Sequence, residues 1–325
     1  MILLNSFTET WFKQCSTHYY HNPYDIGRYN SQYVKRIEKY SDRKDYIKRC
    51  LDVYEPVASR YRKEGLVKID GENFEKTNKE ENLISLLQQL KKEFNEQLKL
   101  NKNLKCLHVD DVDIKEWDKN PNYGPSVRVK DVFLNCPTAF KIASLDLVRD
   151  LATACLQAVP AISAPANLRK SFVNDYYIPG HHDPEFGETQ CFHVDSGSPR
   201  MFKMFFYLND VDLEGGPFAY SVESYKNKHA GWNSVYRQTD EDIKDIYGEH
   251  SIAYATGKVG DIIIANTNAY HKGLKPTKNE RLMLTLNFNI HPENFEKPNI
   301  KIKKEMVENL TEAKKPIIDF MEIIE

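Results

Sequence analysis

The sequence predicts a mainly β core with flanking helices, an α+β fold, and two patterns carry this prediction. Apolar residues recur at helical spacing in the first third of the chain, whereas short β-rich runs between turn residues follow from about residue 170. Hydrophobic residues make up 41% of the 325 residues, which suffices for a packed core. We expect a helical N-terminal region (1–130) that packs on a β-rich domain (131–325), the two forming one unit.

Composition excludes several classes of partner. Lys and Arg total 45 and Asp and Glu total 47, so the net charge of −2 argues against a nucleic-acid-binding surface. No apolar run approaches the roughly 20 residues of a membrane-spanning helix, and the N-terminus lacks the basic region of a secretory signal. The six cysteines are scattered without a CxxC pair, which favours reduced thiols and a cytoplasmic location.

Two helices are predicted most clearly. One spans Lys79–Leu100, with Thr77 or Asn78 as its N-cap, and the other spans Ser144–Ala158 and ends before Pro160. The apolar stripe of the first helix consists of Leu83, Leu86, Leu87, Leu90, Phe94 and Leu98.

Seven short strands are predicted in the second half of the chain, and turn residues lie between them. Many short strands with regular turns indicate a sandwich, a jelly roll or a barrel. The predicted strands are Ser171–Ile178, Cys191–Asp195, Met201–Val211, Pro217–Val222, Ser251–Ala255, Asp261–Asn266 and Arg281–Ile290.

The last of these strands alternates strictly. Leucine, phenylalanine and isoleucine fill the even positions from Leu282 to Ile290, whereas mostly polar residues fill the odd positions from Arg281 to Asn289. If this polar face is buried, it requires either a water-filled interior or a polar ligand, because unpaired buried polar groups are costly. The alternative is an ordinary edge strand with one solvated face.

One group of residues predicts a metal site. His193 and Asp195 stand at positions i and i+2 of a predicted strand, so their side chains point to the same side. His271 follows 78 residues later, and two histidines with one carboxylate form the facial triad of non-haem Fe(II) oxygenases. Arg281 begins the strand with the polar face, where its guanidinium could hold a carboxylate.

A second HxD pattern competes with the first. His181 and Asp183 lie between Pro179-Gly180 and Pro184, in a predicted loop that does not enforce the geometry of positions i and i+2. We therefore favour His193 and Asp195 as the metal ligands.

In these motifs the chain resembles the phytanoyl-CoA dioxygenase family of Fe(II)/2-oxoglutarate-dependent oxygenases. The likeness covers about the last 40% of the chain, and its specificity comes from the order and spacing of five features. These are Phe192–Asp195, Phe202–Val211, Glu214–Tyr220, Gly257–Asp261, and Tyr270–Gly273 together with Arg281. Two turns depart from the family pattern, at Asn266-Thr267 and at Ser221–Tyr225, and both border the expected site.

The resemblance implies a double-stranded β-helix (a cupin-like jelly roll) that holds Fe(II) through His193, Asp195 and His271. It implies that Arg281 binds the distal carboxylate of 2-oxoglutarate, with O₂ as the second co-substrate. The expected reaction hydroxylates a C–H bond of a small molecule and releases succinate and CO₂. Asp195 favours hydroxylation, or a related desaturation or cyclisation, because halogenating relatives carry a small residue in its place.

Further residues are candidates for the pocket. Lys203 either points outward along its strand or supplies a second cation near 2-oxoglutarate. Candidate substrate-binding residues are Tyr176, Gln190, Trp232 and Arg237, the last two in a segment expected to cover the site. The expected substrate is an amino acid, an acyl compound or a specialised metabolite.

Two other functions fit parts of the pattern. A cupin-type isomerase or hydrolase would use another metal, but usually presents three or four histidines with a glutamate and gives Arg281 no role. A non-catalytic jelly-roll interaction protein would have no need to keep both histidines, Asp195 and Arg281.

Overall fold

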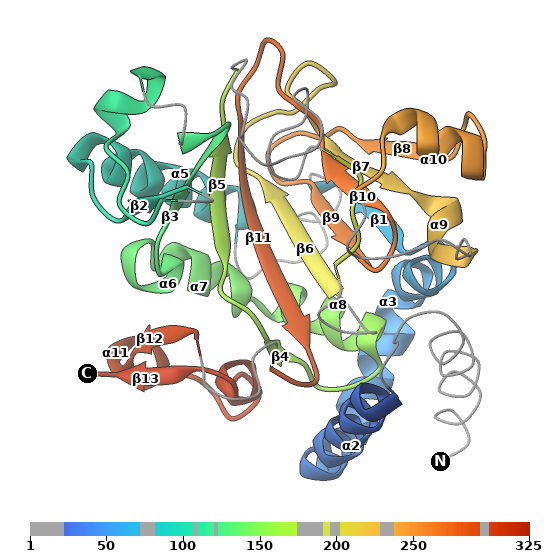
Figure 1. Cartoon of the computed structure of the whole chain (residues 1–325). Coiled ribbons are helices and arrows are strands. Elements are labelled where there is room, and N and C mark those ends of the chain that lie inside the picture. Colours follow the sequence, from blue (N-terminus) through green and yellow to red (C-terminus); the bar gives the residue numbers. More distant parts are fainter. Residues whose placement is uncertain are drawn as a thin grey trace.

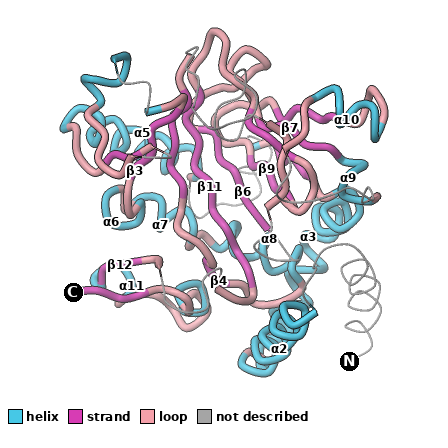
Figure 2. Tube along the Cα trace, in the orientation of Figure 1, coloured by secondary structure: helices cyan, strands magenta, loops and turns pink. Residues whose placement is uncertain are grey.

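A large antiparallel sheet crosses the centre of the molecule, and a small sheet lies beside it with α9 and α10 (Figure 1). This computed structural model describes residues 23–71, 82–106, 109–119, 123–173, 191–195, 202–227, 237–292 and 299–325. Figure 2 shows the strands gathered in the middle and the helices around them. The fold is thus a mixture of helices and antiparallel sheets, as expected.

The helices and strands have the following bounds. The α-helices are α2 (Pro23–Lys39), α3 (Lys44–Glu64), α5 (Leu83–Leu100), α6 (Val132–Asn135), α7 (Thr138–Ala143), α8 (Asp146–Leu156), α9 (Val222–Lys226), α10 (Asp240–Tyr247) and α11 (Lys304–Val307). The strands of the first half are β1 (Leu66–Ile69), β2 (Leu104–Lys105), β3 (Ser126–Val129), β4 (Ala161–Ile162) and β5 (Asn167–Ser171). Those of the second half are β6 (Phe202–Tyr207), β7 (Phe218–Ser221), β8 (Ile252–Ala255), β9 (Ile262–Ala265), β10 (His271–Gly273), β11 (Arg281–Asn289), β12 (Lys301–Lys303) and β13 (Glu322–Ile324).

The large sheet has the strand order β1-β9-β6-β11-β5-β3-β2, and β4 also pairs with β11. The small sheet has the order β10-β7-β8. The two sheets pack face to face, since Phe205 of β6 and Phe218 of β7 lie with their ring centroids 4.6 Å apart in one buried cluster. Strands β1, β2 and β3 come from the first 130 residues, where the sequence analysis predicts only helices.

Strand β11 divides the molecule into two sides. Its even residues, from Leu282 to Phe288, join the core beneath the helices, whereas Met283 joins the cluster between the sheets. β11 lies between β6 and β5 and is buried on both faces, so the alternative of a solvated edge strand is wrong. The polar residues of β11 therefore face the space between the two sheets.

Helix α5 begins later than the sequence analysis predicts. Asn82 is its N-cap, and its side-chain oxygen accepts a hydrogen bond of 2.7 Å from the backbone of Ser85. Thr77 and Asn78, the predicted caps, lie outside the described residues. The second predicted helix is α8, two residues shorter at each end, and it packs against α3.

Five of the seven predicted strands match the structure, whereas the predicted Cys191–Asp195 forms only isolated bridges at Phe192 and His193. β7, β8, β9 and β11 each fall within a predicted run, as does β6, which ends before Val211. β5 is an exception, because it precedes the predicted Ser171–Ile178, the last five residues of which lie outside the described part of the chain. β10 was not predicted as a strand, because its three residues are too few to show alternation.

Gly65 turns the chain from α3 into the large sheet. Its φ of +73° is in the left-handed region that favours glycine. A Cβ at this position would lie 2.1 Å from the hydroxyl oxygen of Tyr220, so a larger residue has no room. The turn places β1 antiparallel to β9, with Leu66 opposite Ala265.

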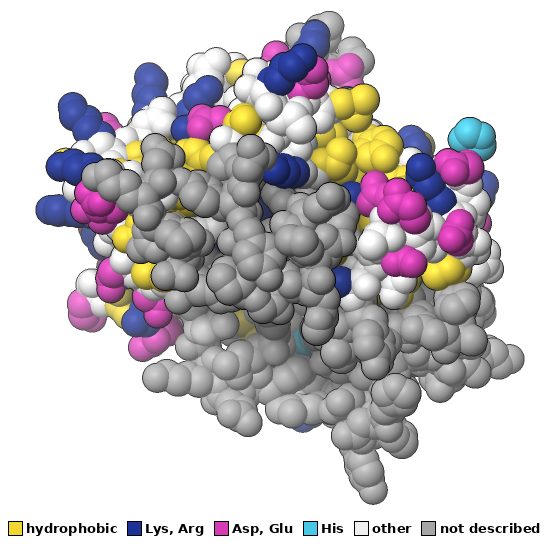
Figure 3. Space-filling view, turned by 45° about the horizontal axis from the view of Figure 1, so that its top comes forward, with side chains coloured by type: hydrophobic (Ala, Val, Ile, Leu, Met, Phe, Trp, Pro, Cys, Tyr) yellow, Lys and Arg dark blue, Asp and Glu magenta, His cyan; other side chains and the backbone are white. Residues whose placement is uncertain are grey.

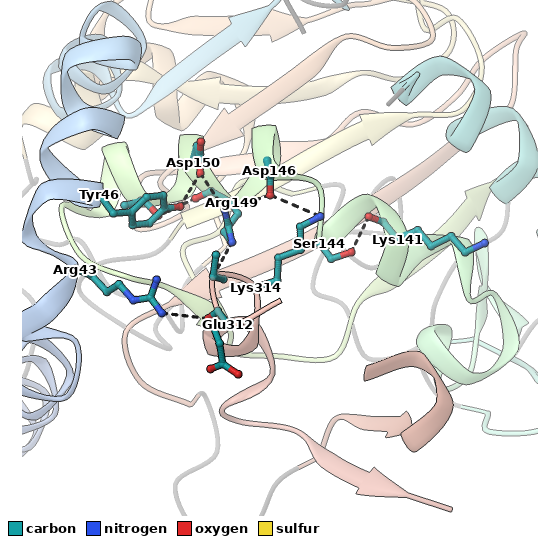
Figure 4. A network of polar contacts seen from close by, with 11 residues as sticks. Arg43, Tyr46, Lys141, Ser144, Asp146, Arg149, Asp150, Glu312 and Lys314 are labelled. Carbon is teal, nitrogen blue, oxygen red and sulfur yellow. Dashed lines mark hydrogen bonds and ion pairs between the residues drawn. The ribbon is translucent and has the colours of Figure 1, made fainter. Parts of the chain in front are cut away.

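A polar network ties the C-terminal segment to α3 and α8 (Figure 4). Tyr46 donates a 2.6 Å hydrogen bond to Asp150, and Arg149 pairs with Asp146 at 3.2 Å. Arg43 donates to the backbone oxygen of Glu312 at 3.2 Å. The contacts of Tyr46 and Arg43 join residues more than a hundred positions apart, so segments distant in the sequence are held together here.

The surface carries no single dominant charge on the face seen in Figure 3, where Lys and Arg side chains are interspersed with Asp and Glu. No helix within the described residues is long and apolar enough to cross a bilayer. The five cysteines of the described chain are free and buried.

Candidate metal centre

Two histidines from distant parts of the chain meet in one antiparallel pair. The backbone N–H of His193 donates to His271 at 3.0 Å, and that of His271 donates back to His193 at 2.9 Å. Residues opposed in this way present their side chains on the same face. The two imidazole centroids lie 4.3 Å apart, beside β10 at the edge of the small sheet.

Asp195 completes the group from two residues further along. Its backbone N–H donates to the carbonyl of Thr267 at 2.9 Å, outside the register that pairs His193 with His271, and its carboxylate lies near the imidazole of His271. Its Oδ2 lies 3.4 Å from His271 Nε2. One potential ligand atom from each of these three residues lies within 4.8 Å of the other two.

Backbone carbonyls orient both imidazoles toward this point. His193 Nδ1 lies 3.0 Å from the carbonyl oxygen of Cys191, and His271 Nδ1 lies 3.0 Å from that of Ala269. A carbonyl only accepts hydrogen bonds, so each Nδ1 carries the proton in a neutral ring. Each Nε2 then keeps a lone pair, which is the arrangement found in metal-binding histidines.

The electrostatics keep the ligands in their metal-binding states. Burial, together with the neighbouring His271, lowers the pKa of His193 to about 3. Burial by itself would raise the pKa of Asp195, but Lys203 and His271 hold it well below its usual range. A neutral imidazole and an ionised carboxylate are the forms that bind a cation.

Lys203 points into the site from β6. Its Nζ donates a 2.6 Å hydrogen bond to Asp195 Oδ2, so the alternative of an outward-pointing lysine is wrong. The side chains of Lys203 and Asp195 are 19% and 25% exposed, and the pair is therefore only partly screened by water. Lys203 neutralises the carboxylate that the sequence analysis predicts as a metal ligand.

Arg281 approaches the same face from β11. It is buried, and its Nη2 donates to the Ser171 hydroxyl at 3.4 Å. A Cβ added to Gly273 would lie 2.7 Å from this Nη2, so the guanidinium rests directly on the backbone of β10. Gly273 stands two residues after His271, and positions i and i+2 share a face of a strand. Arg281 and the imidazole of His271 therefore lie on the same side of β10.

The other predicted pocket residues are placed only in part. Tyr176, Gln190 and Trp232 lie outside the described residues, as do His181 and Asp183 of the competing pattern. Arg237 is exposed and precedes Gln238, whose backbone pairs with that of Phe192. Its positive charge is the smallest of the contributions that lower the pKa of His193, after burial and His271.

Sequence reasoning missed two residues that position Arg281. Ser171 is the hydrogen-bond acceptor opposite Arg281 on β5, and Gly273 leaves the space that the guanidinium fills. Leu168 is the only apolar residue of β5, so the sequence of this strand shows no clear alternation. Nothing in the sequence distinguishes Gly273 from an ordinary turn glycine.

A cavity of about 1110 Å³ lies at the end of the large sheet where β6 ends and β11 begins. It is lined by Lys170 and Leu282, the neighbours of Arg169 and Arg281, and by Lys91 of α5.

No protein-family model matches the chain, and no curated protein sequence matches it. Among solved structures, the chain is similar to the non-heme alpha-ketoglutarate-dependent epimerase SnoN from nogalamycin biosynthesis. The TM-score is 0.49 and the identity 13%, over 75% of this chain and 88% of that chain. EctD from S. alaskensis with bound Fe aligns with a TM-score of 0.49 and 16% identity, over 75% and 82%. The non-heme alpha-ketoglutarate-dependent carbocyclase SnoK from nogalamycin biosynthesis aligns with a TM-score of 0.45 and 14% identity, over 71% and 81%.

The chemistry of the donor set fits Fe(II). Two imidazole Nε2 atoms and one carboxylate on a single face correspond to the facial triad, which leaves the opposite face of a metal open. The guanidinium of Arg281 lies on the same side of β10 as His271, and a guanidinium there is suited to binding a carboxylate.

Proposed function

We propose that the chain is a non-haem Fe(II)- and 2-oxoglutarate-dependent oxygenase of the phytanoyl-CoA dioxygenase family, with its two sheets forming a double-stranded β-helix. It hydroxylates an unactivated C–H bond of a small molecule and releases succinate and CO₂. The observation that carries the proposal is the convergence of His193, Asp195 and His271 on one point, with Arg281 on the same side of β10.

In this proposal each residue of the site has a definite task. His193 and His271 bind the metal through Nε2 because their Nδ1 protons are held by carbonyls. Asp195 supplies the negative ligand, and Arg281 pairs with the distal carboxylate of 2-oxoglutarate. Lys203 exchanges its contact with Asp195 for one with the anionic co-substrate. When bound, Fe(II) and 2-oxoglutarate supply the oxidising chemistry toward O₂.

The burial of the site supports this assignment. Phe218 packs beside His271 with a centroid distance of 5.6 Å, and Tyr220 and Tyr270 are buried around the small sheet. Apolar surroundings exclude water and strengthen the charge interactions of the ligands.

The proposal is tested by anaerobic titration of the purified protein with Fe(II) and then 2-oxoglutarate, followed by absorbance, and by succinate release in air. The wild type is expected to develop a visible absorption band and to release succinate slowly without a substrate. His193→Ala is expected to lose both signals, and His250→Ala, at an exposed histidine, to keep them. Failure to bind 2-oxoglutarate would contradict the proposal and favour a cupin-type metalloenzyme or a non-catalytic protein. Loss of both signals in His181→Ala, with retention in His193→Ala, would contradict the choice of ligands.

A further inference from the structure

One side of the segment Cys191–Asp195 is apolar and packs against α10. Phe192 and Val194 belong to one buried cluster with Ile243 of α10. Successive residues of an extended chain point to opposite sides, so His193, between Phe192 and Val194, faces away from this cluster and toward the metal centre. The contacts around Phe192 therefore decide where the backbone that carries His193 lies.

The backbone of this segment is held along both of its edges. Phe192 exchanges two hydrogen bonds, of 3.0 and 2.9 Å, with Gln238, and His193 exchanges two of the same lengths with His271. One edge is thus bonded to β10, whereas the other is bonded to the chain that leads into α10 at Asp240. A shift of that chain would move the backbone of His193 relative to His271.

Lys272 connects these two edges. It follows His271 in β10 and stands opposite Ala219 of β7, another member of the apolar cluster, so its side chain points to the side of that cluster. Its Nζ lies 4.9 Å from the ring centroid of Phe192 and forms an ion pair with Asp240, the first residue of α10. A single ammonium therefore joins β10, the ring of Phe192 and the first turn of α10.

Burial makes the contacts of this ammonium strong. The side chain of Lys272 is 6% exposed and that of Asp240 29%, and the ring of Phe192 is fully buried. A cation is attracted to an aromatic face most strongly where water is excluded, and a buried ammonium needs its carboxylate because an unpaired buried charge is unfavourable. A capping box between Thr239 and Asp242 fixes the first turn of α10, so the carboxylate of Asp240 is held in place.

We propose that Lys272 is a positioning residue of the metal centre. Held by Asp240, it fixes the ring of Phe192 and thereby the backbone that presents His193 to the metal. This inference rests on the proposed function for the metal, whereas the ordering of the backbone requires none. Because Lys272 directly follows His271, β10 carries one histidine ligand on one face and the support of the other histidine ligand on the opposite face.

The first test measures Mn²⁺ affinity by calorimetry. Lys272→Met keeps an unbranched apolar side chain without the charge, and it is expected to lower the affinity about tenfold, as the loss of groups that orient metal ligands does. Lys272→Arg keeps a cation for Phe192 and Asp240 and is expected to stay within about threefold of the wild type.

Arg36→Met is the matched control for the loss of a buried cation. Arg36 pairs with Asp319 where α2 meets the C-terminal segment, and its side chain is 4% exposed. This variant is expected to lower the melting temperature, because it leaves Asp319 without its buried partner. Its Mn²⁺ affinity is expected to stay within about twofold of the wild type, since its contacts are separate from those of the metal centre.

The second test measures backbone hydrogen exchange in metal-free protein by mass spectrometry of peptides that contain Phe192 and His193. In Lys272→Met their exchange is expected to become about tenfold faster relative to peptides of β11, because the segment opens locally. In Arg36→Met the ratio between the two sets of peptides is expected to remain that of the wild type. An equal increase in both sets in Lys272→Met would indicate general destabilisation and would overturn the inference.

A double-mutant cycle shows whether Lys272 acts through the ring of Phe192. Phe192→Leu keeps the position apolar but removes the aromatic face. In this background Lys272→Met is expected to lower Mn²⁺ affinity by less than about threefold. A tenfold loss in both backgrounds would exclude the ring as the point of action and overturn the inference. Asp240→Asn replaces Lys272→Met in all measurements if the latter unfolds, and Phe192→Met replaces Phe192→Leu.

The two proposals fail separately. If the wild type binds no Mn²⁺ but Lys272→Met accelerates exchange at Phe192 and His193, the metal centre is wrong and the support of this backbone by Lys272 stands. If the wild type binds Mn²⁺ and Lys272→Met changes neither affinity nor exchange, the metal centre stands and the positioning role is wrong. Equal loss of Mn²⁺ affinity in Arg36→Met would also overturn that role.

Discussion

At the scale of single residues, the site depends on hydrogen bonds that fix direction. Carbonyls two residues upstream hold the Nδ1 protons of His193 and His271, so the lone pairs of both rings point to one place. Asp195 Oδ2 accepts from Lys203 at 2.6 Å and also lies 3.4 Å from His271 Nε2. We therefore expect Lys203 to compete with a metal ion for the carboxylate of Asp195.

Replacing Lys203 by Met is expected to tighten metal binding. The variant leaves a partly buried carboxylate without its ammonium, so the metal-free form is destabilised and the incoming ion meets no competitor. We expect roughly tenfold higher affinity for Mn²⁺, equivalent to about 1.4 kcal/mol, measured by calorimetry. Lys170→Met is the matched control from an ordinary ion pair with Glu280. Unchanged or weaker Mn²⁺ binding in Lys203→Met would show that Lys203 does not compete for the carboxylate.

At the scale of secondary structure elements, β10 organises the centre. One face of this three-residue strand carries His271 and the space beneath Arg281, and its pairing with β7 fixes both. Alternation over at least four residues is needed to predict a strand from sequence, so β10 could not be found in that way. β11 could be predicted because it is nine residues long and alternates between apolar side chains, which face the helices, and mostly polar side chains, which face the small sheet.

Gly273→Ala is expected to weaken 2-oxoglutarate binding while leaving the metal site intact. The added methyl group would lie 2.7 Å from Arg281 Nη2, so the guanidinium must shift. We expect the KM for 2-oxoglutarate to rise about tenfold, with Mn²⁺ affinity unchanged. Gly215→Ala serves as the control, because the nearest atoms there lie at 3.4 Å, an ordinary contact. Equal KM values in Gly273→Ala and the wild type would mean that Arg281 does not hold the co-substrate.

At the scale of the whole molecule, contacts between the ends of the chain hold the outer layer together. Arg36 of α2 pairs with Asp319 near the C-terminus and donates to the backbone oxygens of Val159 and Pro316. β1 reaches the large sheet from the N-terminal part, and β12 pairs with β13 at the C-terminal end. The sheets that carry the site are therefore enclosed by elements from both ends.

His291, buried just after β11, is expected to make the stability of the whole chain depend on pH. Burial lowers its pKa from 6.5 to about 4, so between these values the unfolded chain binds the proton more tightly than the folded chain does. Stability is therefore retained above pH 6.5 and lost as the pH falls toward 4. Between pH 7 and pH 5 the loss from this residue is about 2 kcal/mol.

Urea unfolding at pH 7 and pH 5 measures this loss. His291→Gln keeps an amide donor for the carbonyl of Pro292 and is expected to reduce the difference by about 2 kcal/mol, leaving the share of buried His193, whereas His250→Gln, at an exposed histidine, is expected to keep the full difference. A full pH dependence in His291→Gln would show that another group is responsible.

The sequence by itself determined the local features of this protein: the amphipathic helices α5 and α8, most strands of the second half, and the candidate residues His193, Asp195, His271 and Arg281. These follow from spacing, because the period of a helix or strand decides which side chains share a face. Only the tertiary structure decided that Lys203 meets Asp195, that Gly273 lies under Arg281, and that Arg128 opposes Arg169. Such contacts depend on the pairing and register of strands distant in the sequence, which no local pattern specifies.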